Sequence, residues 1–386
     1  MSFNVQNVRT FTTQEGANEV ALDLNIEKEI HHIYFRSENI TLFDCPEAEV
    51  ALSLLWHLKF GIDLSVDRCV SKRFLDSMER VMDIYNTWDR SLNRIRINTK
   101  ETCIKENIGS GRVGLFFSTG IDSLFTLLKN LDEINDLIFI HGFDLRLDEI
   151  ELRNKTSDII ENIGKEFKKN VIHIETNFRE RLGDHFSWAK IMHGVTLATV
   201  GHLISRHYKK IYISANHTYA NLHPAGAHPI LDPLWSTEST EFVHYGCQAD
   251  RIEKAALIAQ YPTALNSIRV CWKKTGGAYN CGECNKCVNA MTNLYLAGAL
   301  DHCSTFSNKI NYRKMKMALN FLTEGGKAFV MQNISYIERN NGDKKLLKAL
   351  KKIHDRPLWK CYFIAAIKKT NMIYETMLKR KNIDLR

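Results

Sequence analysis

The chain has 386 residues, 44% hydrophobic and 25% charged, which is typical of a folded globular protein with two or three structural units. No apolar run approaches the roughly 18 residues of a membrane span, and the start lacks the layout of a signal peptide. We therefore expect a cytoplasmic protein without a membrane-embedded part, in which the ten cysteines are reduced thiols or metal ligands rather than disulfides.

Residues 1–105 are predicted to form a separate N-terminal α+β domain. Residues 31–43 contain the alternation of strands, and residues 47–60 and 71–88 have helical periodicity. The Gly, Ser and Asn content of residues 104–112 indicates a boundary there. No catalytic pattern is present in this domain, so interdomain support and homodimer formation both remain open as its role.

Strands and helices alternate in the next predicted domain, residues 106–300. Four apolar runs predict strands at residues 113–117, 137–141, 171–175 and 210–215. Between them, helical periodicity is found near residues 124–131, 151–168 and 188–198. This rhythm predicts an α/β fold with a doubly wound parallel sheet, and in such folds the chemistry lies at the carboxyl ends of the strands.

The loop Ser118-Thr119-Gly120-Ile121-Asp122-Ser123 follows the first of these strands and leads at once into a predicted helix. A helix N-terminus offers unpaired N–H groups and a positive dipole end, so such a loop is suited to hold phosphate. Gly120 permits close backbone approach, and Ser118, Thr119 and Ser123 add hydroxyl donors. The pattern is neither G-x-x-x-x-G-K-[ST] nor G-x-G-x-x-G. It favours nucleotide binding over an ordinary strand–turn–helix with a capping residue.

Polar residues also follow the other predicted strands. His141 and Asp144 flank Gly142 and Phe143 after the second strand. The third strand leads to Thr176, Asn177 and Arg179, and the fourth to Asn216 and His217. Loop residues are often polar, but four such strand ends together favour a binding crevice.

Four cysteines, Cys271, Cys281, Cys284 and Cys287, lie within 17 residues, and the last three form C-x-x-C-x-x-C. Four thiolates satisfy a tetrahedral zinc ion, so we predict a structural Zn²⁺ site. An iron–sulfur cluster, a redox C-x-x-C pair and free buried thiols are the alternatives.

The loop at Ser118–Ser123 resembles the PP-loop, S-G-G-x-D-S, of the ATP pyrophosphatase (adenine nucleotide alpha hydrolase) family, with Thr119 in place of the first glycine. Together with the four cysteines, residues 112–300 are similar to the 7-cyano-7-deazaguanine synthase family. The Pro-Asp-Cys-Arg segment of that family is absent, and residues 221–246 stand in its place. ATP-dependent thioamide synthetases are another similar group.

The resemblance implies a reaction with ATP and Mg²⁺. A carbonyl or carboxylate oxygen of a small, purine-like substrate is adenylated, pyrophosphate leaves, and a nitrogen or sulfur nucleophile replaces AMP. It also implies roles for individual residues: Ser118, Thr119, Gly120, Ile121 and Ser123 bind pyrophosphate, Asp122 orients metal, water or loop amides, His141, Gly142, Phe143 and Asp144 line the adenosine pocket, and Arg179 and His193 contact phosphate or substrate.

Residues 228–241 are the predicted substrate loop. Asp232, Glu238 and Glu241 supply hydrogen-bond acceptors for a purine-like N–H edge, and Trp235 is placed to stack on a ring. The alternative is a surface loop anchored by a buried tryptophan. If sulfur is the nucleophile, Cys247 or Cys103 is the candidate carrier, although free cysteines are usually small core residues. The choice between an ammonia and a sulfur donor stays open.

Residues 301–386 are predicted to form a basic helical segment. From residue 309 onward there are 19 Lys and Arg against 6 Asp and Glu, a balance of +13 within the net +8 of the chain. Similar PP-loop enzymes modify tRNA, so tRNA binding is a hypothesis here, less favoured than a solvated amphipathic face. The function classes are therefore a small-molecule synthetase, a tRNA-thiolating enzyme and a non-catalytic nucleotide-binding protein.

Overall fold

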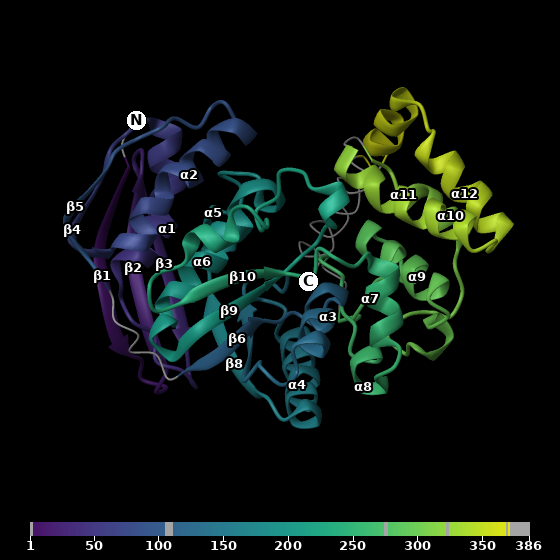
Figure 1. Cartoon of the computed structure of the whole chain (residues 1–386), viewed down its shortest axis with the longest axis horizontal. Coiled ribbons are helices and arrows are strands. Elements are labelled where there is room, and N and C mark those ends of the chain that lie inside the picture. The colour runs from purple at the N-terminus through teal and green to yellow at the C-terminus, as the bar shows by residue number, and fades with distance from the viewer. Residues whose placement is uncertain (1–2, 105–110, 274–276, 322–323, 368–369, 371–386) are drawn as a thin grey trace, which may run out of the picture.

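The computed structural model describes residues 3–104, 111–273, 277–321, 324–367 and 370. An eight-stranded sheet runs through the molecule (Figure 1) in the order β1-β2-β3-β8-β7-β6-β9-β10. Its strands are β1 (Phe3–Thr12), β2 (Asn18–Ile26), β3 (Glu29–Ser37), β6 (Arg112–Phe116), β7 (Asp136–His141), β8 (Asn170–Thr176), β9 (Tyr208–Ser214) and β10 (Glu241–Tyr245). The run β8-β7-β6-β9-β10 is parallel, so the predicted α/β class and parallel sheet are confirmed at that level.

The central parallel strands β6 and β7 are buried on both faces, as their continuous apolar runs predict. Along β7, Leu137 and Phe139 point into one hydrophobic cluster, and Ile138 and Ile140 into another. Helices α1 (Pro46–Phe60) and α6 (His193–Leu203) cover the second cluster, and α3 (Ile121–Lys129) and α4 (Ile150–Phe167) cover the first. The sheet is therefore the middle layer of three.

The remaining helices frame these layers. They are α2 (Lys72–Trp88), α5 (Phe178–Leu182), α7 (Arg251–Ile258), α8 (Pro262–Leu265), α9 (Asn285–Leu296), α10 (Tyr312–Ala318), α11 (Glu324–Arg339) and α12 (Lys344–His354). The predicted helix at 188–198 begins as a π-turn, Trp188–Met192, and continues as α6. Within the described ranges, no helix is long and apolar enough to cross a membrane.

The N-terminal strands β1, β2 and β3 belong to the central sheet, and their buried residues share a hydrophobic cluster with residues of β7 and β8. β3 pairs antiparallel with β8 through Phe35 and Thr176, and Trp56 of α1 packs edge-on against Phe178 of α5. The predicted boundary at residues 104–112 lies largely outside the described residues, because 105–110 are not described. No local pattern indicates this pairing, because strand partners are set by tertiary packing.

A small second sheet corrects the expectation that all cysteines are reduced. β4 (Leu64–Ser71) and β5 (Ile97–Cys103) pair in parallel, and Cys69 and Cys103 are joined by a disulfide with their Cα atoms 5.8 Å apart. Cys103 therefore offers no free thiol here. It also lies in the sheet β4-β5, which is separate from the sheet that carries the Ser118–Ser123 loop.

The C-terminal helices α10, α11 and α12 lie together at the end of the molecule opposite the N-terminal strands (Figure 1). They share a third hydrophobic cluster, which includes Met315, Ile334 and Leu350, and Val288 of α9 joins it. The helical character predicted for this segment is confirmed for its described residues.

Candidate functional site

The Ser118–Ser123 loop lies where the strand order reverses. β7 and β8 extend the sheet on one side of β6, while β9 and β10 extend it on the other, and ligands of open α/β sheets bind at such a point. α3 begins at Ile121 with Gly120 as its N-cap, and no side chain caps it. The Ser123 hydroxyl accepts from the Ser118 N–H at 3.3 Å and donates to the Gly120 carbonyl at 3.1 Å. The loop is thus closed on itself ahead of an uncapped helix N-terminus.

Thr119 has a backbone φ of +57°, in the left-handed region that favours glycine. It is fully buried, and its hydroxyl donates to the Ser118 carbonyl at 2.6 Å. The Arg269 N–H donates to the Thr119 carbonyl at 3.2 Å. Such a backbone costs about 1–2 kcal/mol for a residue with a Cβ, so these contacts hold the loop in a strained shape.

Asp122 is engaged by two cations. Lys254 Nζ lies 2.8 Å from Oδ1 of Asp122, and Arg251 lies 2.9 Å from Oδ2. Burial favours the neutral acid, but Arg251 and Lys254 outweigh it and hold the pKa of Asp122 well below its usual range. Lys254 also donates to the Ala215 carbonyl at 2.7 Å, so this group ties α3, α7 and the end of β9 together.

Sequence reasoning missed Lys254 and Arg251 as partners of the loop. Lys254 is only 1% exposed and stands among the buried residues Ile252, Ala255 and Ile258 of α7. The sequence could have indicated this ion pair, because a lysine on the apolar face of an amphipathic helix is buried and needs a partner of opposite charge.

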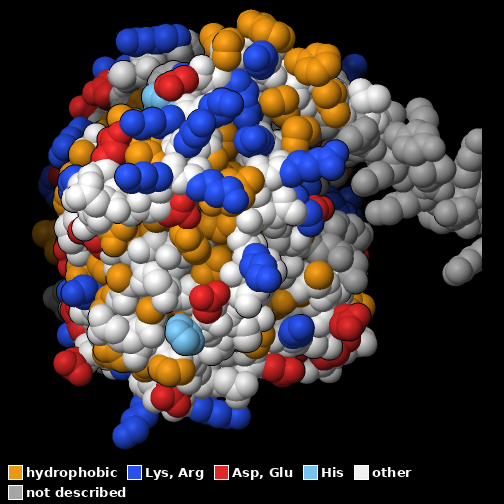
Figure 2. All heavy atoms as spheres, turned by 90° about the vertical axis from the view of Figure 1, so that its right-hand side faces the viewer, with side chains coloured by type: hydrophobic (Ala, Val, Ile, Leu, Met, Phe, Trp, Pro, Cys, Tyr) orange, Lys and Arg blue, Asp and Glu red, His pale blue; other side chains and the backbone are white. Residues whose placement is uncertain are grey.

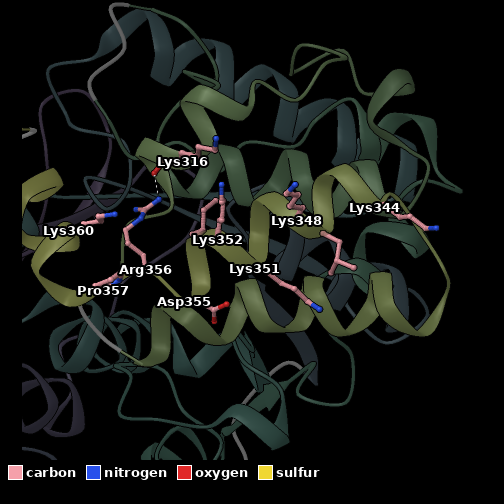
Figure 3. Close-up of a pocket in the computed structure, with 11 residues that line it drawn as sticks. Lys316, Lys344, Lys348, Lys351, Lys352, Asp355, Arg356, Pro357 and Lys360 are labelled. Atoms are coloured by element: carbon pink, nitrogen blue, oxygen red, sulfur yellow. Dashed lines mark hydrogen bonds between the residues drawn. The ribbon is translucent and has the colours of Figure 1, made fainter.

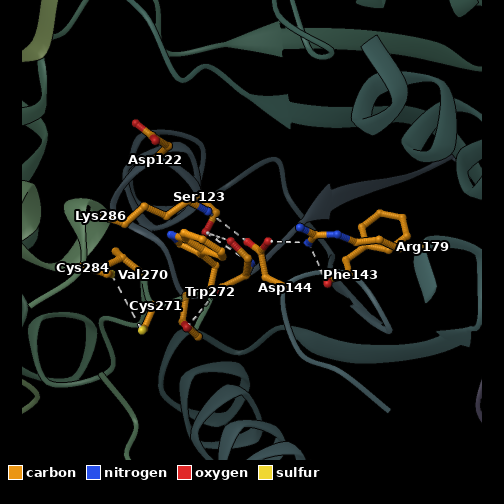
Figure 4. A network of polar contacts seen from close by, with 12 residues as sticks. Asp122, Ser123, Phe143, Asp144, Arg179, Val270, Cys271, Trp272, Cys284 and Lys286 are labelled. Atoms are coloured by element: carbon orange, nitrogen blue, oxygen red, sulfur yellow. Dashed lines mark hydrogen bonds and ion pairs between the residues drawn. The ribbon is translucent and has the colours of Figure 1, made fainter. Parts of the chain in front are cut away.

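Asp144 and Arg179 come together beside Ser123 of the loop (Figure 4), and the His193 ring lies 6.3 Å from the Phe143 ring. Arg179 donates to the Phe143 carbonyl at 2.8 Å and to Asp144 at 3.0 Å, and Lys286 of α9 lies 3.4 Å from the other Asp144 oxygen. Burial raises the pKa of Asp144, but Lys286 and Arg179 outweigh this and keep the pKa far below its ordinary value. Burial lowers the pKa of His193, which Asp144 opposes. The predicted residues Phe143, Asp144, Arg179 and His193 therefore share one polar network.

His141 and Gly142 shape the turn before this network. The His141 imidazole is buried and lies 3.2 Å from that of His173, and burial, with Arg153 and His173, lowers its pKa to about 3. Gly142 has φ of +96°, and a Cβ there would lie 1.9 Å from the Thr176 carbonyl oxygen. Position 142 thus accepts only glycine, and the two residues support the turn.

The four cysteines form a cluster that could hold a metal ion such as zinc. All four sulfur atoms lie within 4.8 Å of one another, and the Cys271–Cys284 and Cys281–Cys287 distances are 3.9 and 3.8 Å. A tetrahedron of sulfurs at the usual zinc–sulfur length of 2.3 Å has edges of about 3.8 Å. Hydrogen bonds from Cys271, Cys284 and Cys287 hold the pKa of the Cys281 thiol well below its usual range. The donor set and its geometry fit the ion.

Lys286, which lies between Cys284 and Cys287 in the sequence, connects the four-cysteine cluster to the Asp144 network. Cys284 is the N-cap of α9 and accepts from the Cys287 N–H, and Lys286 lies between the two ligands. Figure 4 shows Lys286, Cys271 and Cys284 on the same side of Asp144. A metal at the four sulfurs would therefore fix the helix end from which Lys286 reaches Asp144.

The predicted substrate loop is largely structural. Trp235 is fully buried and packs against Phe74 at 6.2 Å, so it is a core anchor and not a stacking platform. Glu238 accepts from Ser71 Oγ at 2.7 Å and from the Arg73 N–H at 2.8 Å, which fixes the start of α2. Glu241 opens β10 at the amino end of the parallel strands, opposite the Ser118–Ser123 loop. The observed contacts of Trp235 and Glu238 are therefore structural, because packing decides the direction of loop side chains.

Asp232 instead forms a buried pair with His244. Its carboxylate lies 2.7 Å from His244 Nδ1, and the two side chains are 0% and 3% exposed. Burial lowers the pKa of His244, but Asp232 and the neighbouring Cys247 thiol outweigh it and raise the pKa to about 9. Cys247 is buried. The preceding residue, Gly246, lies next to Lys254, because a Cβ placed on Gly246 would be 3.5 Å from Nζ of Lys254. This Asp–His–Cys group therefore lies at the carboxyl end of β10, beside the partners of Asp122.

Residues of α11 contact the same end of the sheet. Phe329 stacks on His217 with ring centroids 5.0 Å apart and lies under the Arg251 guanidinium at 4.2 Å. The C-terminal helices are thus in contact with a partner of Asp122.

The fold and site define an α/β protein with a mostly parallel sheet, a polar network at its strand ends and a four-cysteine cluster suited to a metal ion. Comparison with models of protein families, with curated proteins and with solved structures found no match to this chain.

Proposed function

We propose that this protein is an ATP-dependent synthetase of the PP-loop type, which adenylates an oxygen of a small substrate and then replaces AMP. The observation that carries the proposal is the Ser118–Ser123 loop, placed at the reversal of the strand order ahead of a helix that no side chain caps. Backbone N–H groups and the helix dipole at that point suit the outer phosphates of a nucleotide.

The loop residues have separate tasks in this proposal. The exposed Ser118 hydroxyl and the amide of the partly exposed Gly120 hold the pyrophosphate group, the buried Thr119 shapes the turn between them, and Ser123 keeps the loop closed. Asp122 does not touch phosphate. Its ion pairs with Lys254 and Arg251 keep it charged and fix the start of α3.

Magnesium supplies charge neutralisation on the phosphates of ATP when it is bound. The carboxylates that stand nearest the loop, Asp122 and Asp144, are both paired with cations, so they do not fit as its ligands. Any magnesium ion would therefore arrive with the phosphates of ATP and is not held by these two carboxylates. Arg179 and Lys286, which converge on Asp144, are two further cationic groups near the loop.

The chemistry balances in two steps. An acceptor oxygen attacks the α-phosphorus, the bond to the β-phosphate oxygen breaks, and pyrophosphate leaves. A nucleophile then attacks the activated carbon, the carbon–oxygen bond breaks, and AMP leaves with that oxygen. The uncapped end of α3 stabilises the negative charge of the leaving pyrophosphate.

A sulfur nucleophile is the second candidate, and the group Asp232–His244–Cys247 favours it over ammonia. A protonated imidazole beside a thiol is the usual arrangement of reactive cysteines, and His244 has a pKa of about 9, raised by Asp232 and Cys247 against the effect of burial. We assign the four-cysteine cluster to structural zinc, which holds α9 and with it Lys286.

The test is conversion of ATP to AMP and pyrophosphate, followed by ³¹P NMR with candidate purine-like carboxylic acids and amides. Ser118→Ala removes an exposed hydroxyl and should slow the conversion at least tenfold with an unchanged melting temperature. Ser65→Ala, at an exposed serine of β4, is the matched control and should be silent. ATP binding without any turnover would instead favour a non-catalytic nucleotide-binding protein.

A further inference from the structure

The sequence of α12 separates its apolar and charged residues onto two faces. Leu346, Ala349, Leu350 and Ile353 are buried against α10 and α11. This packing leaves the lysines of α12 on the outer face, at the spacing of successive helical turns. Figure 2 shows lysine and arginine side chains gathered on the upper part of the face that carries the C-terminal helices.

These lysines line a hollow of about 680 Å³, which we call the basic groove. α12 contributes Lys344, Lys348, Lys351 and Lys352 to it. Lys316 of α10 and Arg356 and Lys360, which follow α12, complete its wall (Figure 3). Arg356 donates to the Lys316 carbonyl at 2.8 Å, so the two sides of the groove are tied together.

The groove is strongly unbalanced in charge. Among the residues that line it, Asp355 is the single acid, and its carboxylate lies 2.9 Å from His354. Lys351 contacts Glu338 of α11. Lys344, Lys348 and Lys352 are exposed and follow one another at i, i+4 and i+8, where like charges repel. An anionic ligand with several charges would relieve that repulsion.

Exposed aromatic side chains stand directly after the groove. Residues 358–367 are helical, and Trp359, Tyr362 and Phe363 are 66%, 62% and 62% exposed. Lys360 lies over the Trp359 ring at 5.2 Å, so one residue of the groove touches this aromatic group. Flat rings beside a row of lysines are the combination that binds unpaired bases and their phosphates.

We propose that the basic groove and the aromatic side chains of residues 359–363 bind single-stranded nucleic acid. The phosphates of the strand enter the groove along α12, where Lys344 to Lys352 span about 12 Å, and the bases stack on the exposed rings. A single strand can enter the groove with its phosphates, whereas a flat bilayer would contact only the rim of the groove. This inference is independent of the proposed reaction, because no residue of the Ser118–Ser123 loop lines the groove.

The experiment is fluorescence anisotropy of the full chain with a fluorescein-labelled 20-nucleotide oligo(U) at several salt concentrations. The variant Lys344→Glu/Lys348→Glu/Lys352→Glu should weaken binding more than tenfold. Because each phosphate contact contributes about 0.7 to the salt slope for single strands, the slope should fall by about 2. Trp359→Ala should weaken oligo(U) binding about tenfold by loss of stacking and should leave duplex binding unchanged.

A charge-matched control separates the groove from net charge. Lys28→Glu/Lys129→Glu/Lys165→Glu makes the same change in charge at exposed lysines outside the groove and should alter the affinity less than threefold. Equal losses in the two triple variants would overturn the proposal. The proposal would also be overturned if oligo(U) did not bind, while vesicles of phosphatidylcholine and phosphatidylserine bound the wild type and not the variant Lys344→Glu/Lys348→Glu/Lys352→Glu. Thermal melts of all variants should agree within a few degrees, because every substituted side chain is exposed.

Discussion

Neutralising Asp122 is expected to destabilise the fold by about 3 kcal/mol. Lys254 is 1% exposed and lies 2.8 Å from the Asp122 carboxylate, so Asp122→Asn leaves a buried ammonium without its counter-charge. Removal of one partner of a buried ion pair costs about 3–5 kcal/mol. The partial exposure of Asp122 and Arg251, at 15% and 21%, puts the expected loss at the lower end of that range.

The double variant Asp122→Asn/Lys254→Met should recover most of that loss. Neither buried charge remains in it, and Arg251 is exposed enough to turn toward water. We expect its free energy of unfolding to lie within about 1 kcal/mol of the wild type, which corresponds to a coupling of at least about 2 kcal/mol between the two sites.

Equilibrium unfolding in urea, followed by tryptophan fluorescence, measures both quantities. Asp76→Asn is the control, because its pair with Lys72 is exposed on both sides and should contribute less than about 0.5 kcal/mol. If Asp122→Asn behaves like Asp76→Asn, or if the losses at Asp122 and Lys254 simply add, the reasoning about this buried pair is refuted.

Three further outcomes follow from the site. The pKa of His244 is raised from 6.5 to about 9 in the folded state. Protonated His244 should therefore stabilise the fold by up to about 3 kcal/mol, fully below pH 6.5, and this contribution should be lost as the pH rises through 9. His244→Gln should remove this pH dependence of the free energy of unfolding in urea titrations. Elemental analysis should find one zinc ion per chain, and Cys281→Ser should remove it and lower the melting temperature. Gly142→Ala should cost more than about 2 kcal/mol because its Cβ meets a carbonyl at 1.9 Å, whereas Gly298→Ala, with open space around it, should cost about 1 kcal/mol in a urea titration.

The sequence predicted those features that depend on local pattern. The short apolar run before Ser118 indicated a strand buried on both faces, and the strands and helices of residues 112–214 lie close to where their patterns indicate. The four cysteines were found because thiolate spacing is itself the signature of a metal cluster. Asp144 and Arg179 meet because parallel strand ends share one edge of the sheet.

The sequence did not predict features that depend on pairing between distant segments. Nothing local tells that Phe35 pairs with Thr176, or that Cys69 and Cys103 come together on a separate small sheet. Trp235 and Glu238 also depend on distant segments. Trp235 packs against Phe74, and Glu238 accepts a hydrogen bond from the Arg73 N–H at the start of α2. His244 had no visible partner until the fold placed it 2.7 Å from Asp232.

The proposed function requires that the Ser118–Ser123 loop binds the pyrophosphate group of ATP. Isothermal titration of inorganic pyrophosphate into the wild type and into Gly120→Ala tests it most directly. A Cβ at Gly120 lies 3.3 Å from Ser118 Oγ and its φ is −70°, so alanine fits the backbone while adding a methyl group to the loop. We expect the wild type to bind pyrophosphate in competition with ATP, and Gly120→Ala to weaken that binding at least tenfold without a change in melting temperature. Equal pyrophosphate affinity in the two proteins, or no binding to the wild type, would contradict it.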